Sequence, residues 1–195
     1  MPNYNKSQRF YIPFIPSAQV NYFILFQLYE IAKYNPINKC HDTVIYKSVA
    51  ELAKVLNISS STLNRILTNA EYKEFITVDK SKRTIIINND IRKSGKPFVI
   101  LNITEIQILR SIGENLLCKY LICLKYYCGS SKTKTVDMTA KQFLEKMGYS
   151  TNTNYPDRLA HYNTILKGYK LLNIKSYIDG AGHKRNIYTY LYSFG

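Results

Sequence analysis

Residues 48–67, SVAELAKVLNISSSTLNRIL, constrain the fold more than any other stretch of this chain. Ser48 and Glu51 have the spacing of a capping box, which predicts that a helix begins at Val49. Apolar residues then recur at helical spacing and should be buried on one face. They are Leu52, Ala53 and Leu56. A short amphipathic helix is therefore expected here.

A second short helix should follow a tight corner. Asn57 tolerates left-handed backbone, and Ile58 is placed to fill the angle between the two helices. A new helix start is available at Ser59 or Ser60. Its inner face would consist of Leu63, Ile66 and Leu67. Together the two segments predict a helix-turn-helix.

The outer face of the second helix contains no carboxylate. It carries Ser60, Ser61, Thr62, Asn64, Arg65, Thr68 and Asn69. Such donors and acceptors can reach phosphates and base edges in a major groove, as a recognition helix does. Asn64 and Arg65 are the expected base readers, because Asn can pair with adenine and Arg can bridge guanine O6 and N7. Ser60, Ser61 and Thr62 would contact the DNA backbone. The alternative is an ordinary helical hairpin with a solvated polar face.

Two β-branched runs follow the second helix. Residues 75–78 and 84–88 should form strands around the polar tip at 79–83. Two strands with a basic tip predict a wing, with its cations beside phosphates or in a minor groove. The cations expected to contact the DNA backbone are Lys80, Lys82 and Arg83.

The same pattern recurs 91 residues later. Residues 139–143 answer 48–52, and residues 147–150 answer 56–59. Thr139 and Gln142 again form a capping box, and Gly148 stands at the corner, where positive φ is needed. The chain is therefore expected to contain two modules of similar design.

The second module diverges after its corner. A longer turn leads to Pro156, which suits the first position of a helix expected to run to about Leu172. Its inner face would hold Leu159, Tyr162, Ile165, Leu166, Tyr169 and Leu172. Its outer face would carry Arg158, His161 and Asn163 for base readout, Thr164, and Lys167 and Lys170 for phosphate.

A second wing is predicted from residues 174–178 and 187–191. The tip between them, 179–185, is flexible and basic, and His183, Lys184 and Arg185 would contact the DNA backbone. The alternative is a simple hairpin loop that charge keeps soluble.

With these elements the chain resembles a tandem winged-helix protein. A helix at 17–34 would precede the first module, and helices within 104–128 would precede the second. Among such families it is similar to the replication initiators of plasmids and mobile elements, and the run RFYIP at residues 9–13 before a long helix adds to the likeness. The resemblance implies an α+β, mainly helical fold with two consecutive winged helix-turn-helix domains. It also implies binding to repeated origin sequences in double-stranded DNA, with the protein itself or replication proteins as further partners.

The domain boundary is expected near Pro97, which gives domains 1–97 and 98–195. Residues 88–97 form a turn-rich connection. A short strand at 98–101 should precede a helix whose start is marked by Thr104 and Gln107, three residues apart as in a capping box. Gly113 should weaken or split that helix. The apolar stretch 116–127 should lie in the second core or against a partner.

Charge agrees with a polyanionic partner. The formal net charge is +14, and residues 1–97 hold 14 Lys and Arg against 7 acids, while the rest hold 13 against 6. An even excess suggests that both modules face a polyanion, although positive charge also serves solubility. Most of the 18 tyrosines fall on core positions, as Tyr22 and Tyr29 illustrate, but exposed ones leave stacking on single-stranded nucleic acid open.

No enzyme chemistry, metal or cofactor is predicted. The four cysteines form no CxxC pair and are read as reduced thiols, including Cys40 beside His41. The three histidines lie far apart, and Gly95-Lys96-Pro97 lacks the other residues of a phosphate-binding loop. The first nine residues are polar and 116–127 is too short to span a bilayer, so a cytoplasmic protein without a membrane partner is expected.

Three roles remain open at the level of sequence. Replication initiation and transcriptional regulation would use the same DNA-binding surface. A non-enzymatic scaffold or loader would instead bind a protein partner, with weak DNA affinity that ignores sequence.

Overall fold

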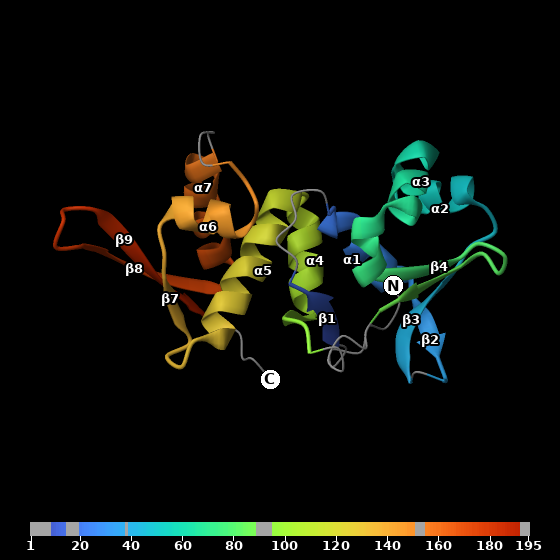
Figure 1. The fold of residues 1–195 in the computed structure, drawn as a ribbon, viewed down its shortest axis with the longest axis horizontal. Coiled ribbons are helices and arrows are strands. Elements are labelled where there is room, and N and C mark those ends of the chain that lie inside the picture. The colour runs from blue at the N-terminus through green and yellow to red at the C-terminus, as the bar shows by residue number, and fades with distance from the viewer. Residues whose placement is uncertain (1–8, 15–19, 38, 89–94, 151–154, 192–195) are drawn as a thin grey trace. The chain divides into compact units, whose positions relative to one another are not determined.

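The computed structural model describes residues 9–14, 20–37, 39–88, 95–150 and 155–191 (Figure 1). Within them lie seven α-helices, one short 3-10 helix and three antiparallel sheets. Helix accounts for about 47% of the described residues, which confirms an α+β fold richer in helix than in strand. The described residues divide into two compact units. Unit 1 takes 9–13 and 20–113, and unit 2 takes Phe14 and 114–191.

Unit 1 is built around a four-stranded sheet ordered β2-β3-β5-β4. Its elements in chain order are α1 (Tyr22–Ile31), β2 (Lys33–Asn35), β3 (Cys40–Ile45), α2 (Val49–Val55), α3 (Ser60–Thr68), the 3-10 helix η1 (Ala70–Glu74), β4 (Ile76–Asp79) and β5 (Thr84–Ile87). Strand β3 pairs with β5, with Val44 opposite Ile85, and β4 closes the hairpin on the other side of β5. Fully buried Leu28, Leu63 and Phe75 fill the core beneath the helices.

Helix α1 is shorter than the helix expected at 17–34. Asn21 caps it by accepting from the Phe23 N–H at 3.0 Å, and Asn21 N–H in turn donates to the Tyr72 hydroxyl at 2.7 Å. At the other end the chain leaves the helix at Ala32 and enters β2, because pairing with β3 satisfies its backbone there. Residues 17–19 of the expected helix lie outside the described residues.

Two elements extend unit 1 past residue 97. Strand β6 (Phe98–Asn102) pairs with β1 (Arg9–Pro13), and α4 (Ile103–Ile112) follows it. The capping pair expected at Thr104 and Gln107 is wrong, because the cap lies two residues earlier. Asn102 is the cap, because it accepts from Glu105 N–H at 2.8 Å while the Glu105 carboxylate accepts from Asn102 N–H at 2.9 Å. Gly113 ends the helix at φ +81°, so the expected break occurs there.

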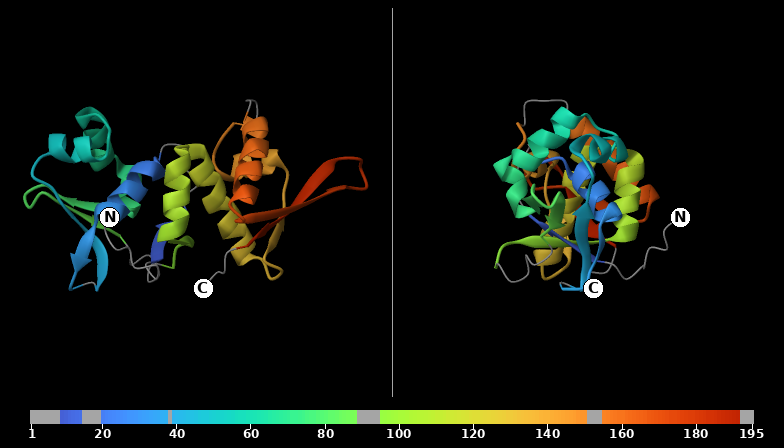
Figure 2. Two further views of the ribbon diagram at one scale, coloured as in Figure 1. Left: turned by 180° about the vertical axis from the view of Figure 1, so that it is seen from behind. Right: turned by 90° about the vertical axis from the view of Figure 1, so that its right-hand side faces the viewer.

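Unit 2 repeats this architecture with fewer strands. Its elements are α5 (Asn115–Ser130), β7 (Thr135–Asp137), α6 (Ala140–Lys146), α7 (Tyr155–Gly168), β8 (Leu172–Ile178) and β9 (Lys184–Tyr190), with sheet order β7-β9-β8. The hairpin of β8 and β9, red in Figure 2, projects beyond the helices of its unit. Phe143 makes T-shaped contacts with both Tyr120 and Tyr188, so a cluster of aromatic rings lies within a core that is otherwise mainly leucine. The apolar stretch 116–127 lies within α5, largely buried as expected.

Both units share one order of elements. Leaving aside β1, β2, η1, β6 and α4, which only unit 1 has, each unit runs helix, strand, helix, helix, strand, strand. In each, the strand before the two short helices pairs with the second strand of the hairpin, β3 with β5 and β7 with β9. The corner residues match too, since Asn57 (φ +52°) and Gly148 (φ +74°) both adopt the left-handed backbone predicted for them. The repeat seen in the sequence is therefore a repeat of topology.

The end of α7 corrects the sequence interpretation. The helix stops at Gly168, and Lys170 lies in the following turn with φ +56° and not on the helix. Leu171 N–H bonds back to Leu166 C=O at 2.9 Å, and Leu172 already begins β8. Tyr169, expected to face inward, is 44% exposed because it sits in that turn.

The second wing also differs in detail from its prediction. Strand β9 begins at Lys184, so Lys184 and Arg185 lie on the strand, and the tip shrinks to residues 179–183. The pairing of Ile178 with Lys184 extends the ladder toward the turn, which leaves less of the tip unpaired than expected. Among the described residues, no helix has the length and apolar character needed to cross a membrane.

Candidate nucleic-acid interface

Helix α3 presents the polar face that the sequence predicted. Ser59 caps it by accepting from Thr62 N–H at 3.1 Å. Leu63 and Ile66 are buried on its inner side, which fixes the orientation of the helix. Opposite them, five side chains are exposed on the outer face: Ser60, Ser61, Asn64, Arg65 and Thr68. No acidic residue lies on α3, and no described residue accepts a hydrogen bond from the Arg65 guanidinium.

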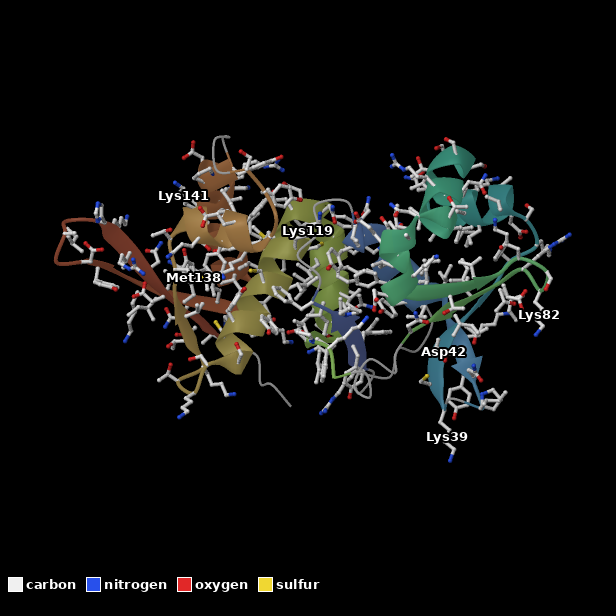
Figure 3. The ribbon with its side chains drawn as sticks, viewed as in Figure 1. Lys39, Asp42, Lys82, Lys119, Met138 and Lys141 are labelled. Carbon is white, nitrogen blue, oxygen red and sulfur yellow. The ribbon has the colours of Figure 1, made fainter. Side chains whose placement is uncertain are left out.

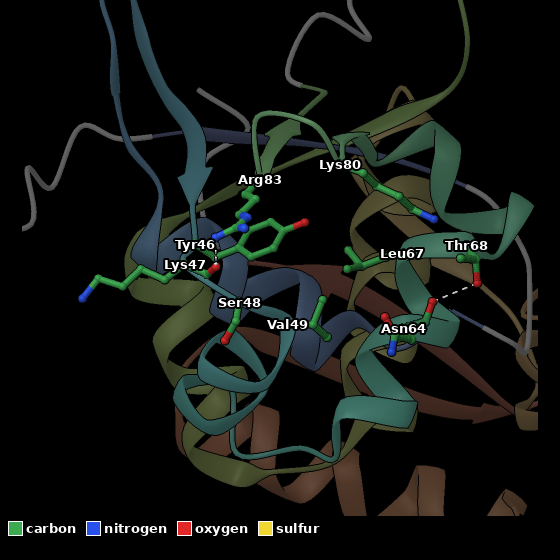
Figure 4. Close-up of a pocket in the computed structure, with 9 residues that line it drawn as sticks. All are labelled: Tyr46, Lys47, Ser48, Val49, Asn64, Leu67, Thr68, Lys80 and Arg83. Carbon is green, nitrogen blue, oxygen red and sulfur yellow. Dashed lines mark hydrogen bonds between the residues drawn. The ribbon is translucent and has the colours of Figure 1, made fainter.

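A hollow of about 420 Å³ lies between α3 and the turn that joins β4 to β5 (Figure 4). It is lined by Tyr46, Lys47, Ser48, Val49, Asn64, Leu67, Thr68, Lys80 and Arg83. None of these residues is acidic, and three are cationic. The hollow thus continues the carboxylate-free character of α3 onto the wing.

The wing turn is tied to the strand beside it. Arg83 adopts φ +51°, its carbonyl accepts from Tyr46 N–H at 3.1 Å, and its guanidinium donates to Lys47 C=O at 2.6 Å. Part of the donor capacity of Arg83 is therefore committed within the chain. Arg83 still lines the hollow, with its guanidinium on the β3 side beside the Lys47 carbonyl (Figure 4).

Asp79 organises the tip of this wing. Its carboxylate accepts from the Ser81 hydroxyl and from Lys82 N–H at 3.0 Å, and these bonds, the Ser81 bond first, lower the pKa of Asp79. The Lys82 ammonium is 3.6 Å from the same carboxylate but stays 80% exposed. Lys82 is at the end of the wing and Lys39 is at the far end of the β2–β3 hairpin (Figure 3). The tip thus offers an exposed cation on a well-defined turn.

In unit 2, Arg158 is engaged within the protein. Its guanidinium lies 2.9 Å from the Glu114 carboxylate and donates to the Tyr162 hydroxyl at 2.9 Å, while Tyr162 itself donates to Glu114. The bond from Tyr162, then that from Arg158, lowers the pKa of Glu114. The guanidinium also lies over the Tyr155 and Tyr162 rings.

Asn163 has a comparable internal role. Its side-chain oxygen accepts from the hydroxyl of buried Tyr120 at 2.8 Å. His161 and Lys167, by contrast, are exposed on α7, and Asp157 places a carboxylate in the first turn of the helix. Of the three base readers expected in unit 2, two are thus hydrogen-bonded to their own chain.

The base of the second wing carries an ion pair. Arg185 Nε donates to Asp137 at 3.1 Å, and the Tyr177 hydroxyl donates to the same carboxylate. His183 N–H donates to the Asp179 carboxylate at 2.9 Å, and this bond is the first cause of the lowered pKa of Asp179. Lys184 is exposed on β9. The predicted phosphate contacts of this wing are therefore split between one exposed lysine and two residues with acidic partners.

Sequence analysis missed two residues of unit 1. Tyr46 and Lys47 link β3 to α2, and both line the hollow. Only their position directly before the capping residue Ser48 could have indicated that they lie beside the helices, since a two-residue connection has no periodicity to detect. The partners of Arg158 and Asn163 were missed because they lie 44 and 43 residues away.

Metal or thiol chemistry finds little support. Within the described ranges, no three His, Cys, Asp or Glu residues gather as a metal site would require. Cys118, Cys123 and Cys128 are free and buried, and burial raises the pKa of Cys123 to about 12. Such thiols stay protonated near neutral pH and are poor nucleophiles.

Comparison with known proteins gives no assignment. Neither protein-family models, nor curated proteins, nor solved structures gave a match to this chain.

Proposed function

We propose that the protein binds double-stranded DNA sequence-specifically through two winged-helix modules, one in each unit. The observation that carries the proposal is the outer face of α3, which holds Asn64 and Arg65 and no carboxylate. The basic wing turn lies beside it across the hollow. A protein that reads a duplex needs both surfaces, because contacts to base edges give sequence specificity and contacts to phosphates fix its position.

The repeated topology supports the modular part of the proposal. A winged helix consists of a helical hairpin followed by a β-hairpin, with a short strand closing the sheet. Both units have this order, and their sheets close in the same way. In this proposal α3 and α7 are the recognition helices, and the turns 80–83 and 179–183 are the wings.

The two modules would contribute unequally. In unit 1, Asn64 and Arg65 read bases, while the backbone is contacted by Ser60, Ser61, Thr62, Lys80 and Lys82, with Arg83 adding charge. In unit 2, His161, Lys167 and Lys184 are exposed, whereas Arg158 and Asn163 would have to leave Glu114 and Tyr120 to reach DNA. We therefore assign most sequence discrimination to unit 1 and mainly backbone contacts to unit 2.

Replication initiation on a plasmid or other mobile element is our first choice of biological role, without catalysis and without a cofactor. The tandem modules suit repeated origin sites, and a cytoplasmic location follows from DNA as the partner. The second candidate is a transcriptional regulator that uses the same surface on a single operator. The third is a non-enzymatic scaffold or loader that binds a protein partner.

Selection from a pool of random duplexes at about 0.15 M salt tests the proposal, since bulk phosphate attraction is weakened there. A long or bipartite motif is expected. Its position in the source genome then separates the roles, because repeats in an origin indicate initiation and one site over a promoter indicates regulation. If no motif is enriched, sequence-specific binding is wrong and the scaffold is favoured.

A further inference from the structure

The hollow beside α3 contains a tyrosine hydroxyl to which no described residue is hydrogen-bonded. Tyr46 as a whole is only 9% exposed, and it lines the hollow. A tyrosine whose ring is buried usually places its hydroxyl against a hydrogen-bond partner. Figure 4 shows the Tyr46 hydroxyl pointing into the space between the wing turn and α3. An incoming group with an acceptor oxygen would satisfy it.

The charge around this hydroxyl selects for an anion. The Lys80 side chain extends along the α3 side of the hollow, and Arg83 stands on the other side with its guanidinium at the β3 end, whereas Lys47 points away (Figure 4). The lining has no carboxylate to compete for these donors. The Thr68 hydroxyl donates to Asn64 C=O at 2.8 Å, so its proton is already used within α3. The hollow is thus rich in donors and positively charged.

We propose that this hollow holds one phosphodiester of the DNA backbone, bound by the Tyr46 hydroxyl and the Lys80 ammonium. This inference rests on the proposed function and deepens it. The volume of about 420 Å³ lies in the range of sites for small ligands, which leaves room for the phosphate and adjoining sugar atoms. Asn64 belongs both to the lining and to the base-reading face, so a phosphate held here lies next to the base contacts.

The described residues of unit 2 differ at the matching place. Where β7 leads into α6, Asp137 occupies the base of the wing and binds Arg185 and Tyr177. A carboxylate there disfavours a phosphate. We therefore assign the phosphodiester site to unit 1, where it fixes the register of α3 on the duplex.

Two substitutions test the site with little risk to the fold. Tyr46→Phe removes only the hydroxyl and keeps the buried ring, and Lys80→Gln changes an exposed turn residue. The matched control is Lys39→Asn, which removes one positive charge at the far hairpin of the same unit, and Asn is favourable at its φ of +52°. Thermal melting confirms folding, and if Tyr46→Phe does not fold, Lys80→Gln carries the test.

Binding is measured by fluorescence anisotropy on the selected duplex and on copies that each carry one uncharged methylphosphonate. Tyr46→Phe should weaken binding about tenfold, and Lys80→Gln should lower the slope of log affinity against log salt by about 0.9. At one position, a methylphosphonate should weaken wild-type and Lys39→Asn binding about tenfold but cost the Tyr46→Phe and Lys80→Gln proteins little more.

The opposite pattern overturns the inference. If every methylphosphonate weakens binding by Tyr46→Phe and by wild type equally, the hollow holds no phosphodiester. The proposed function would still stand in that case if Arg65→Ala lost its sequence specificity. If wild type binds no duplex, both fail. Calorimetry with inorganic phosphate and a nucleoside monophosphate provides the last arm: binding abolished by Tyr46→Phe, with duplex affinity unchanged, would assign the hollow to a free nucleotide.

Discussion

Asn57 and Gly148 stand at matching corners of the two units, and both adopt positive φ. A residue with a Cβ pays about 1–2 kcal/mol for that conformation, less for Asn because its short polar side chain tolerates it. Each corner sets the angle between two short helices. Neither α2 nor α6 could hold that angle alone, since both have only seven residues.

Removing this tolerance should destabilise each unit. We expect Gly148→Ala to lower the free energy of unfolding by about 1–2 kcal/mol, and Asn57→Ala by about 1 kcal/mol. Asn57→Gly is the control and should change it by a few tenths only. Urea titration followed by circular dichroism measures all three, and equal stability of Asn57→Ala and wild type would contradict the role of the corner.

Arg65 is the residue on which base reading depends most. If it bridges a guanine, Arg65→Ala should weaken binding to the selected site by about 10- to 100-fold through the loss of one bidentate contact. Competitor duplexes changed at that base pair should then no longer be discriminated. Anisotropy competition gives the result, with Lys39→Asn as the charge control. A uniform loss on all sequences would make Arg65 a phosphate contact instead.

At the scale of elements, α7 is held to the start of α5 by Glu114, Arg158 and Tyr162. The carboxylate has a lowered pKa in the folded state, so it stabilises the fold above its unfolded pKa. That contribution disappears as the pH falls through the lower, folded pKa. Because the Glu114 side chain is 37% exposed and its ion pair is screened by solvent, the effect is about 1 kcal/mol or less.

This cluster makes a prediction about pH. Glu114→Gln should be less stable than wild type at pH 7, and the difference should shrink as the pH falls through the lowered pKa of Glu114, below which both side chains are neutral. Urea unfolding over a series of acidic pH values measures it. A difference that does not change with pH would show that the substitution acts through packing and not through the charge.

The wing of unit 1 is the element expected to contact phosphate. Lys82 is highly exposed on a turn that Asp79 organises, so Lys82→Ala should weaken all sequences alike and lower the salt slope by about 0.9. Salt titrations on the selected and on an unrelated duplex check this. A change in sequence preference would place Lys82 among the base readers.

At the scale of the whole molecule, both halves carry a similar excess of positive charge. If both units bind one duplex, each wing releases its own counterions. The double variant Lys82→Ala with Lys184→Ala should then lower the salt slope by about twice as much as Lys82→Ala alone. If Lys184→Ala alone behaves as wild type, only unit 1 engages DNA in this way.

Much of the fold was predictable because its signals are local. Caps, corners and β-branched runs lie within a few residues of what they control, and so Ser48, Ser59 and Thr139 start their helices as expected. The end of α7 was missed because Tyr169 and Leu172 continue a helical pattern by coincidence, while pairing of Leu172 with Tyr190 favours a strand.

The amino-acid sequence by itself determined the repeat, the positive charge and the carboxylate-free face of α3. Only the tertiary structure decided which polar residues are free to meet a partner. It paired β1 with β6, bound Arg158 to Glu114 and Asn163 to Tyr120, and left the Tyr46 hydroxyl facing a cationic hollow. The reason is physical: helix caps and periodicity act over one or two turns, whereas ion pairs and hollows form between residues dozens of positions apart.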